Sequence, residues 1–209
     1  MFKKLLAKSI PPNADKHSKA HKSASYTAHI GAVMQSADVL LDRIGSEILR
    51  QLGLTVDFLH FANTVKLGAY LHDWGKANQH FQEMLYLKYL PKSDDPKLRD
   101  WGKKIRKQQK DEGRSDRQMI RHEVISGILA LQVPSFRAWL EQCPNADLMV
   151  AVWAAIGHHL KLKSEFTEIL DGTGCRLQIF THHDYFKLVL KMGRQYLGLP
   201  DTLPEPCKE

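Results

Sequence analysis

Residues 68–81 read GAYLHDWGKANQHF and place a histidine, an aspartate and a lysine within five positions of an otherwise apolar run. The segment 57–75, DFLHFANTVKLGAYLHDWG, repeats apolar residues three and four apart after an N-cap at Asp57, which predicts an amphipathic helix. His72 and Asp73 would then lie at the inner, C-terminal end of this helix. A buried imidazole or carboxylate is costly unless it is hydrogen-bonded or bound to a metal, so this helix end is a candidate site.

The rest of the chain shows the same helical period and predicts an all-α bundle. It contains no alternating strand pattern and no repeat of 20–50 residues. The run 146–159 is nearly all apolar, as expected of a helix in the centre of a bundle, and we assign Trp139 and Trp153 to packing. Further helices are expected within residues 25–53, 77–91, 118–133 and 175–198.

The 209 residues fit one domain of ordinary size. We expect a basic leader or arm over residues 1–24, the helical domain over 25–198, and a proline-rich tail or linker over 199–209. Within the domain, residues 92–117 are strongly charged and predict a solvated, partly helical insertion.

Composition favours a cytoplasmic protein. The three cysteines are irregularly spaced, which excludes a disulfide framework or a C-x-x-C zinc site and favours a reducing compartment. The apolar N-terminal segment is interrupted at Lys8 and Pro11, and no stretch approaches the roughly 18 apolar residues of a membrane span. The net charge of +7 and the pI near 9.3 favour a polyanionic partner such as nucleic acid, although solubility alone also explains this charge.

A His-Asp pair alone is a weak signal, because 11 histidines in one chain provide such pairs by chance. The pair at 183–184 lies at a predicted helix start, where Asp184 favours the helix dipole. The pair at 72–73 ends a helix instead, as do His158 and His159.

Five histidines and one aspartate thus recur at inward positions of four predicted helices. Each alone can be a satisfied core residue, but together they indicate a metal site of the kind that helical bundles assemble from facing side chains. Imidazole binds transition metals, and a carboxylate bridges two ions. Two ions about 3.5–4 Å apart activate a water and stabilise the attacking and leaving oxygens of a phosphodiester. The candidate ligands are His29, His72, Asp73, His122, His158 and His159.

The ordered set formed by His29, HDWGK at 72–76, His122 and GHH at 157–159 resembles the HD superfamily of metal-dependent phosphohydrolases. Residues 71–85, LHDWGKANQHFQEML, are similar to the motif region of the HD nuclease of type I CRISPR interference. This resemblance covers about residues 25–160. It implies an HD-type bundle that cuts single-stranded DNA with two divalent ions, such as Mn, Ni, Fe, Co or Mg. It also implies a CRISPR helicase and effector complex as partners in antiviral defence.

The resemblance further implies a role for each candidate residue. His29 and His72 would bind one ion, Asp73 would bridge the two, and the remaining three candidate histidines would bind the second. Lys76 matches the family lysine near the active centre, where a cation steadies the phosphate or the developing charge. Equally, Lys76 can be a partner of the helix dipole at the end of the helix.

One departure leaves other functions open. The family usually supplies a further aspartate from a late helix, and here Asp184 is the nearest candidate and Asp171 a poorer one. Either the ion has fewer protein ligands, or the chain is a fragment of a nuclease-helicase. The alternatives are a nucleotide or cyclic-nucleotide phosphohydrolase and a degenerate, non-catalytic HD module.

Two basic segments are candidates for holding DNA. One is the leader run KHSKAHK, and the other is the charged insertion. Within the insertion Trp101 offers a base-stacking surface, because aromatic side chains beside cationic grooves hold single strands. A solvated charged face is the alternative interpretation. The cationic candidates are Lys103, Lys104, Arg106 and Lys107.

Overall fold

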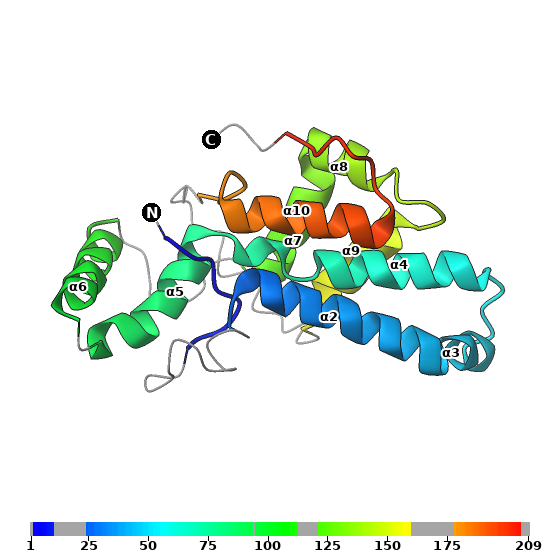
Figure 1. Ribbon diagram of the computed structural model, residues 1–209, viewed down its shortest axis with the longest axis horizontal. Helices are drawn as coiled ribbons and strands as arrows, with labels where there is room; N and C mark the ends of the chain where they lie inside the picture. Colours follow the sequence, from blue (N-terminus) through cyan, green and yellow to red (C-terminus); the bar gives the residue numbers. More distant parts are fainter. Residues whose placement is uncertain (1, 11–23, 94, 113–120, 160–177, 206–209) are drawn as a thin grey trace.

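The structure is a computed structural model that describes residues 2–10, 24–93, 95–112, 121–159 and 178–205. These residues form helices joined by short connections, with two isolated β-bridges and no strand among them (Figure 1). The expected all-α bundle is therefore confirmed. In chain order the elements are α2 (Tyr26–Leu40), a π-helical turn η1 (Leu41–Gly45), α3 (Ser46–Gln51), α4 (Phe58–Leu71), a 3-10 turn η2 (Trp74–Lys76), α5 (Gln79–Tyr89), a 3-10 turn η3 (Leu90–Lys92), α6 (Pro96–Asp111), α7 (His122–Gln132), α8 (Pro134–Leu140), α9 (Leu148–Gly157) and α10 (Asp184–Leu197).

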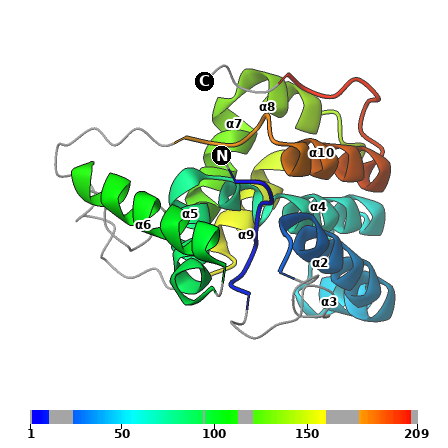
Figure 2. The same ribbon diagram turned by 60° about the vertical axis from the view of Figure 1, so that its left-hand side comes forward.

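Helix α4 lies at the centre of the bundle. It contacts α2, α9 and α10, while α7 packs against α9 and η2 (Figures 1 and 2). Asp57 caps the start of α4 as predicted, because its side chain accepts hydrogen bonds from the backbone N–H groups of Leu59 and His60. None of the helices in the described ranges is long and apolar enough to cross a bilayer.

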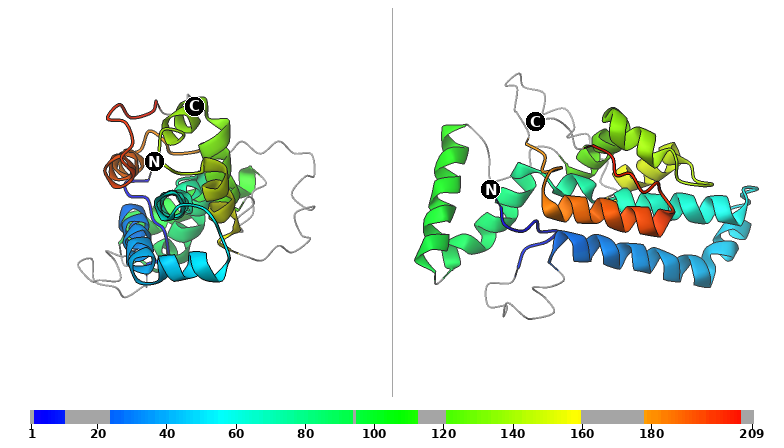
Figure 3. Two further views of the ribbon diagram at one scale, coloured as in Figure 1. Left: turned by 90° about the vertical axis from the view of Figure 1, so that its right-hand side faces the viewer. Right: turned by 45° about the horizontal axis from the view of Figure 1, so that its top comes forward.

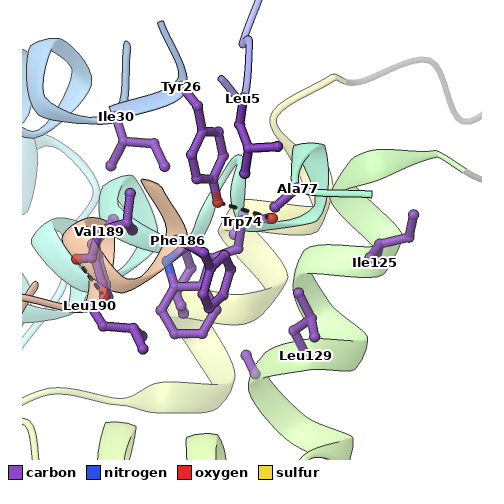
Figure 4. Packing of buried hydrophobic residues seen from close by; sticks show 14 of the residues in the cluster. Leu5, Tyr26, Ile30, Trp74, Ala77, Ile125, Leu129, Phe186, Val189 and Leu190 are labelled. Carbon is purple, nitrogen blue, oxygen red and sulfur yellow. Dashed lines mark hydrogen bonds between the residues drawn. The ribbon is translucent and has the colours of Figure 1, made fainter. Parts of the chain in front are cut away.

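Trp74 anchors the turn that follows α4. It is fully buried, and its ring contacts those of Tyr70, Phe136 and Phe186 at centroid distances of 5.2, 5.6 and 5.5 Å. The hydroxyl of Tyr26 donates a 3.1 Å hydrogen bond to the Trp74 carbonyl (Figure 4). Because close-packed aromatic rings leave little room for movement, this cluster fixes the turn that carries the His-Asp pair.

The N-terminal segment is part of the core. Leu6 is buried and exchanges two hydrogen bonds with the Gln82 side chain, one from its N–H at 2.9 Å and one to its carbonyl at 2.8 Å. The same Gln82 amide donates to the Lys76 carbonyl at 2.8 Å. The prediction of a leader or arm is therefore wrong for residues 2–10, whose apolar side chains fill the bundle. Residues 11–23, with the run KHSKAHK, lie outside the described residues, and the other domain boundaries stay predictions.

Helix α9 is half exposed, so the prediction that it lies in the bundle centre is wrong. Its Ala151 and Ala155 face the core, but Val150 and Trp153 are 55% and 69% exposed. Only one side of α9 packs against α4 and α7, and a helix that is apolar all round carries no polar face to indicate its outer side. Trp139 is buried as predicted, and its indole N–H donates to the Pro200 carbonyl at 3.2 Å.

The charged insertion contains α6, which lies beyond α5 at one end of the molecule (Figures 1 and 3). Trp101 on α6 is partly buried and packs against Phe2 and Tyr86, with centroid distances of 5.6 and 5.3 Å. Its ring is therefore packed against the core on one side, and its use as a base-stacking surface stays a prediction. DNA binding by this helix stays a prediction that depends on its exposed cations Lys103, Lys104, Arg106 and Lys107.

We expect Leu5→Ala to lower the free energy of unfolding by about 3 kcal/mol, because Leu5 is fully buried and truncation leaves a cavity. Leu52→Ala is the matched control. Leu52 is 64% exposed, so this change should shift stability by no more than about 0.5 kcal/mol. Urea denaturation measures both, and equal effects would contradict the docking of the N-terminal segment in the core.

Candidate metal centre

The candidate ligands come together where four helices meet. His29 lies in the first turns of α2, and His122 is the first residue of α7. His72 and His158 are the C-cap residues of α4 and α9. The C-terminal end of a helix carries partial negative charge, so the ends of α4 and α9 both favour a cation at this point.

The Asp73 carboxylate is the centre of the cluster. It is fully buried, and its Oδ2 lies 2.8 Å from His29 Nε2 and 3.0 Å from His72 Nε2. The Lys76 ammonium donates to the same oxygen at 2.6 Å. The ligand atoms of His29, His72 and Asp73 lie within 4.8 Å of one another and form the first ligand group.

The other carboxylate oxygen faces a second ligand group. Asp73 Oδ1 lies 3.1 Å from His122 Nε2 and 3.7 Å from His158 Nε2. The ligand atoms of His122, His158 and His159 also lie within 4.8 Å of one another. The structure thus brings all six candidate side chains together, with one carboxylate between two groups. Metal binding by these six residues remains a proposal.

Backbone carbonyls set the orientation of two of the rings. Nδ1 of His72 lies 2.6 Å from the Ala69 carbonyl, and Nδ1 of His158 lies 2.5 Å from the Ala155 carbonyl. A carbonyl oxygen only accepts, so each Nδ1 carries a proton, and in the neutral ring each Nε2 then has a lone pair directed towards Asp73. This is the arrangement in which a histidine binds a metal through Nε2.

The buried acceptors fit a divalent cation. His72 Nε2 and Asp73 Oδ1 are buried and make no hydrogen bond within the part of the chain that the structure describes. His72 Nε2 lies 3.0 Å from the other Asp73 oxygen, and in the neutral ring these two acceptors repel unless a cation lies between them. Imidazole nitrogens with one carboxylate suit transition metals, so these residues fit the metals expected from the sequence.

Electrostatics favour the ligand forms of Asp73, His158 and His159. Burial alone would raise the pKa of Asp73, but contacts with His122, His29 and His72 outweigh it and hold this pKa well below its usual range. Burial lowers the pKa of His158, and it lowers that of His159, where the neighbouring His158 adds to the effect. A carboxylate and neutral imidazoles are the protonation states that metal binding requires.

Gly75 lets the two groups approach each other. Its N–H donates to Ser126 Oγ at 2.8 Å, and that hydroxyl donates in turn to the His122 carbonyl at 3.1 Å. A Cβ at Gly75 would overlap the His122 carbonyl oxygen and lie 2.7 Å from the Ser126 nitrogen. The glycine of HDWGK therefore allows η2 to pack directly against α7.

The two ligand groups border a cavity of about 620 Å³. Its polar side is formed by Lys76 and by five of the six candidate ligands, all except His122, and the remaining wall comes from α2, α4 and α9. That wall is apolar and built from small side chains: Val33, Val65, Gly68, Ala69, Ala154 and Ala155.

The family model described as "Cas3, HD domain" matches residues 13–201. This chain belongs to the Cas3 HD-domain family. The resemblance inferred from the motifs is thereby confirmed. No solved structure matches the chain.

A curated relative of this Cas3 HD domain is the "Putative CRISPR-associated nuclease/helicase Cas3" of Myxococcus xanthus (strain DK1622). The two are 29% identical over 201 residues, which cover 95% of this chain and 23% of the relative. The chain thus spans about a quarter of the length of that curated relative.

The late aspartate of the Cas3 HD domain is not provided by Asp184. This residue is exposed at the start of α10 and belongs to neither ligand group, so the weak candidate from the sequence is wrong. The adjacent His183 caps α10 and contacts the Phe2 carbonyl at 3.0 Å instead. Asp171 lies outside the described residues.

Two further residues of this HD domain, Arg121 and Glu123, contact the second ligand group and were not among the candidates from the sequence. Glu123 is buried with its Oε2 3.3 Å from His122 Nδ1, and the Arg121 side chain contacts both Glu123 and the His159 carbonyl. The triplet Arg-His-Glu at 121–123 was the available signal. An acidic residue in the first turn of a helix is ordinarily explained by its interaction with the helix dipole, so Glu123 did not stand out as a site residue.

We expect Gly75→Ala to lower the free energy of unfolding by about 3 kcal/mol or more, because the added methyl group must displace the backbone of α7. Gly157→Ala is the matched control, since a Cβ there meets nothing within 4 Å. Thermal and urea unfolding measure both variants. A Gly75→Ala protein as stable as the control would contradict the close contact between η2 and α7.

Proposed function

We propose that this HD domain is a metal-dependent nuclease that hydrolyses phosphodiester bonds of single-stranded DNA in CRISPR antiviral defence. The observation that carries the proposal is the placement of one buried carboxylate, Asp73, between two groups of imidazole nitrogens. Membership of the Cas3 HD-domain family supports the same reaction class.

The two ligand groups would each hold one metal ion. His29 and His72 would hold one divalent ion and the second ligand group the other, with one Asp73 oxygen directed to each. When bound, such ions supply an activated water and stabilise the phosphodiester oxygens during displacement. Asp73 would serve both groups, because its Oδ2 lies beside the first ligand group and its Oδ1 beside the second.

Lys76 would act on the substrate side of the centre. Its ammonium group is buried and donates to Asp73, which favours a role in the centre over that of a partner for the α4 dipole. A cation at this position steadies the scissile phosphate or the charge that develops on it. Asp73 and Lys76 are therefore the residues to which we assign catalysis.

The cavity supports a nucleic-acid substrate. Its apolar wall can take the sugar and base next to the scissile phosphate without reading the base, because it offers no side-chain donor or acceptor. The net charge of +7 favours a polyanion. The relative's name, a nuclease/helicase, supports a helicase as the partner that delivers the strand, within a CRISPR effector complex.

The purified chain with Mn²⁺ is expected to degrade a fluorescently labelled single-stranded oligonucleotide, and EDTA should abolish the reaction. Asp73→Ala should reduce cleavage to background, because it removes the carboxylate shared by the two groups. Gel analysis of the products over time measures the rates. Intact DNA with wild-type protein that does bind metal would favour the non-catalytic module, and hydrolysis of nucleotides alone would favour a nucleotide phosphohydrolase.

Lys76→Met tests the second catalytic assignment in the same assay. We expect kcat to fall about 10²-fold while metal binding is retained. Lys66→Met is the matched control. Lys66 is a residue of α4, and its ammonium group pairs with Asp38 at 3.0 Å and not with Asp73. Equal rates for the two variants would contradict a role for Lys76 in catalysis.

A further inference from the structure

Glu123 is a buried carboxylate that the proposed chemistry does not use. It is 3% exposed, and a charge so buried is costly unless it is paired. Its Oε2 lies 3.3 Å from His122 Nδ1, and its Oε1 accepts from the Arg121 guanidinium. One oxygen thus faces a candidate metal ligand and the other faces an arginine.

Arg121 extends this contact to a second ligand. Its Nη2 donates a 2.9 Å hydrogen bond to the His159 carbonyl. Through Arg121, one carboxylate is connected to two of the three residues in the second ligand group. The positive charge of Arg121 balances the negative charge of Glu123. The two side chains together therefore orient His122 and His159 more than they attract a cation.

Helix geometry distinguishes His122 from two of the other candidate ligands. His72 and His158 end their helices, so each ring can donate to a carbonyl three residues earlier. His122 begins α7, and no earlier turn of that helix can supply a carbonyl. The Glu123 carboxylate lies within reach of the His122 Nδ1 and can accept from it.

We propose that Glu123, together with Arg121, is a positioning residue that holds His122 and His159 in the orientation needed to bind the second ion. The proposal rests on the metal centre of the proposed function but does not require DNA cleavage. Glutamine at this position would keep the shape and one carbonyl oxygen. Its amide group cannot accept from the other partner, so one of the two connections is lost.

Calorimetric titration of the full chain with Mn²⁺ tests the proposal. Wild type should show two binding steps, and Glu123→Gln should weaken one of them by roughly 10- to 100-fold while leaving the other unchanged. Glu141→Gln is the matched control, because Glu141 forms an exposed pair with Arg137 at 2.8 Å on α8. Two unchanged steps in Glu123→Gln, or equal weakening of both, would overturn the proposal.

Nitrogen NMR of the imidazoles in the metal-free protein reports the tautomer of His122. A residue that only stabilises the fold would leave this tautomer unchanged. His122 should carry its proton on Nδ1 in wild type and show a mixture of tautomers in Glu123→Gln. An unchanged tautomer would overturn the proposal.

If Glu123→Gln does not fold, Arg121→Gln carries the test, because Arg121 is 30% exposed and the same binding step should weaken. Wild type that binds two ions without cutting DNA would defeat the proposed function and leave this inference intact.

Discussion

The structure depends on one buried carboxylate. Asp73 lies in the turn after α4, fully enclosed, with imidazoles from three further helices and an ammonium group around it. A lone charge in this position would be expensive, so the surrounding groups are what make its burial possible. The aromatic packing of Trp74 and the close contact of Gly75 with α7 serve to hold this turn in place.

Much of the fold was predictable because its signals are local. The apolar period and the Asp57 cap placed α4, and the period alone put His72 and Asp73 at its inner end. The ligand groups needed more than local pattern, since a His-Asp pair also occurs at 183–184 by chance. The resemblance in motif order brought together residues from four helices that no single period could connect.

The errors have physical reasons. Trp153 was assigned to the core because α9 is apolar on all sides, so periodicity could not tell its outer face from its inner one. Leu5 and Leu6 were missed because their segment is too short and too basic to show a period, yet Gln82 and the core bind it. Glu123 was missed because its role depends on the ring of its neighbour, which only three-dimensional contacts reveal.

In the proposed metal centre, one Asp73 carboxylate serves two ion sites. Anomalous X-ray diffraction from crystals grown with Mn²⁺ tests it most directly, because the metal is located independently of activity. We expect two anomalous peaks, one beside His29 and His72 and one beside the second ligand group, with an Asp73 oxygen directed to each. A single peak, or none, at a Mn²⁺ concentration that saturates binding in solution would contradict it.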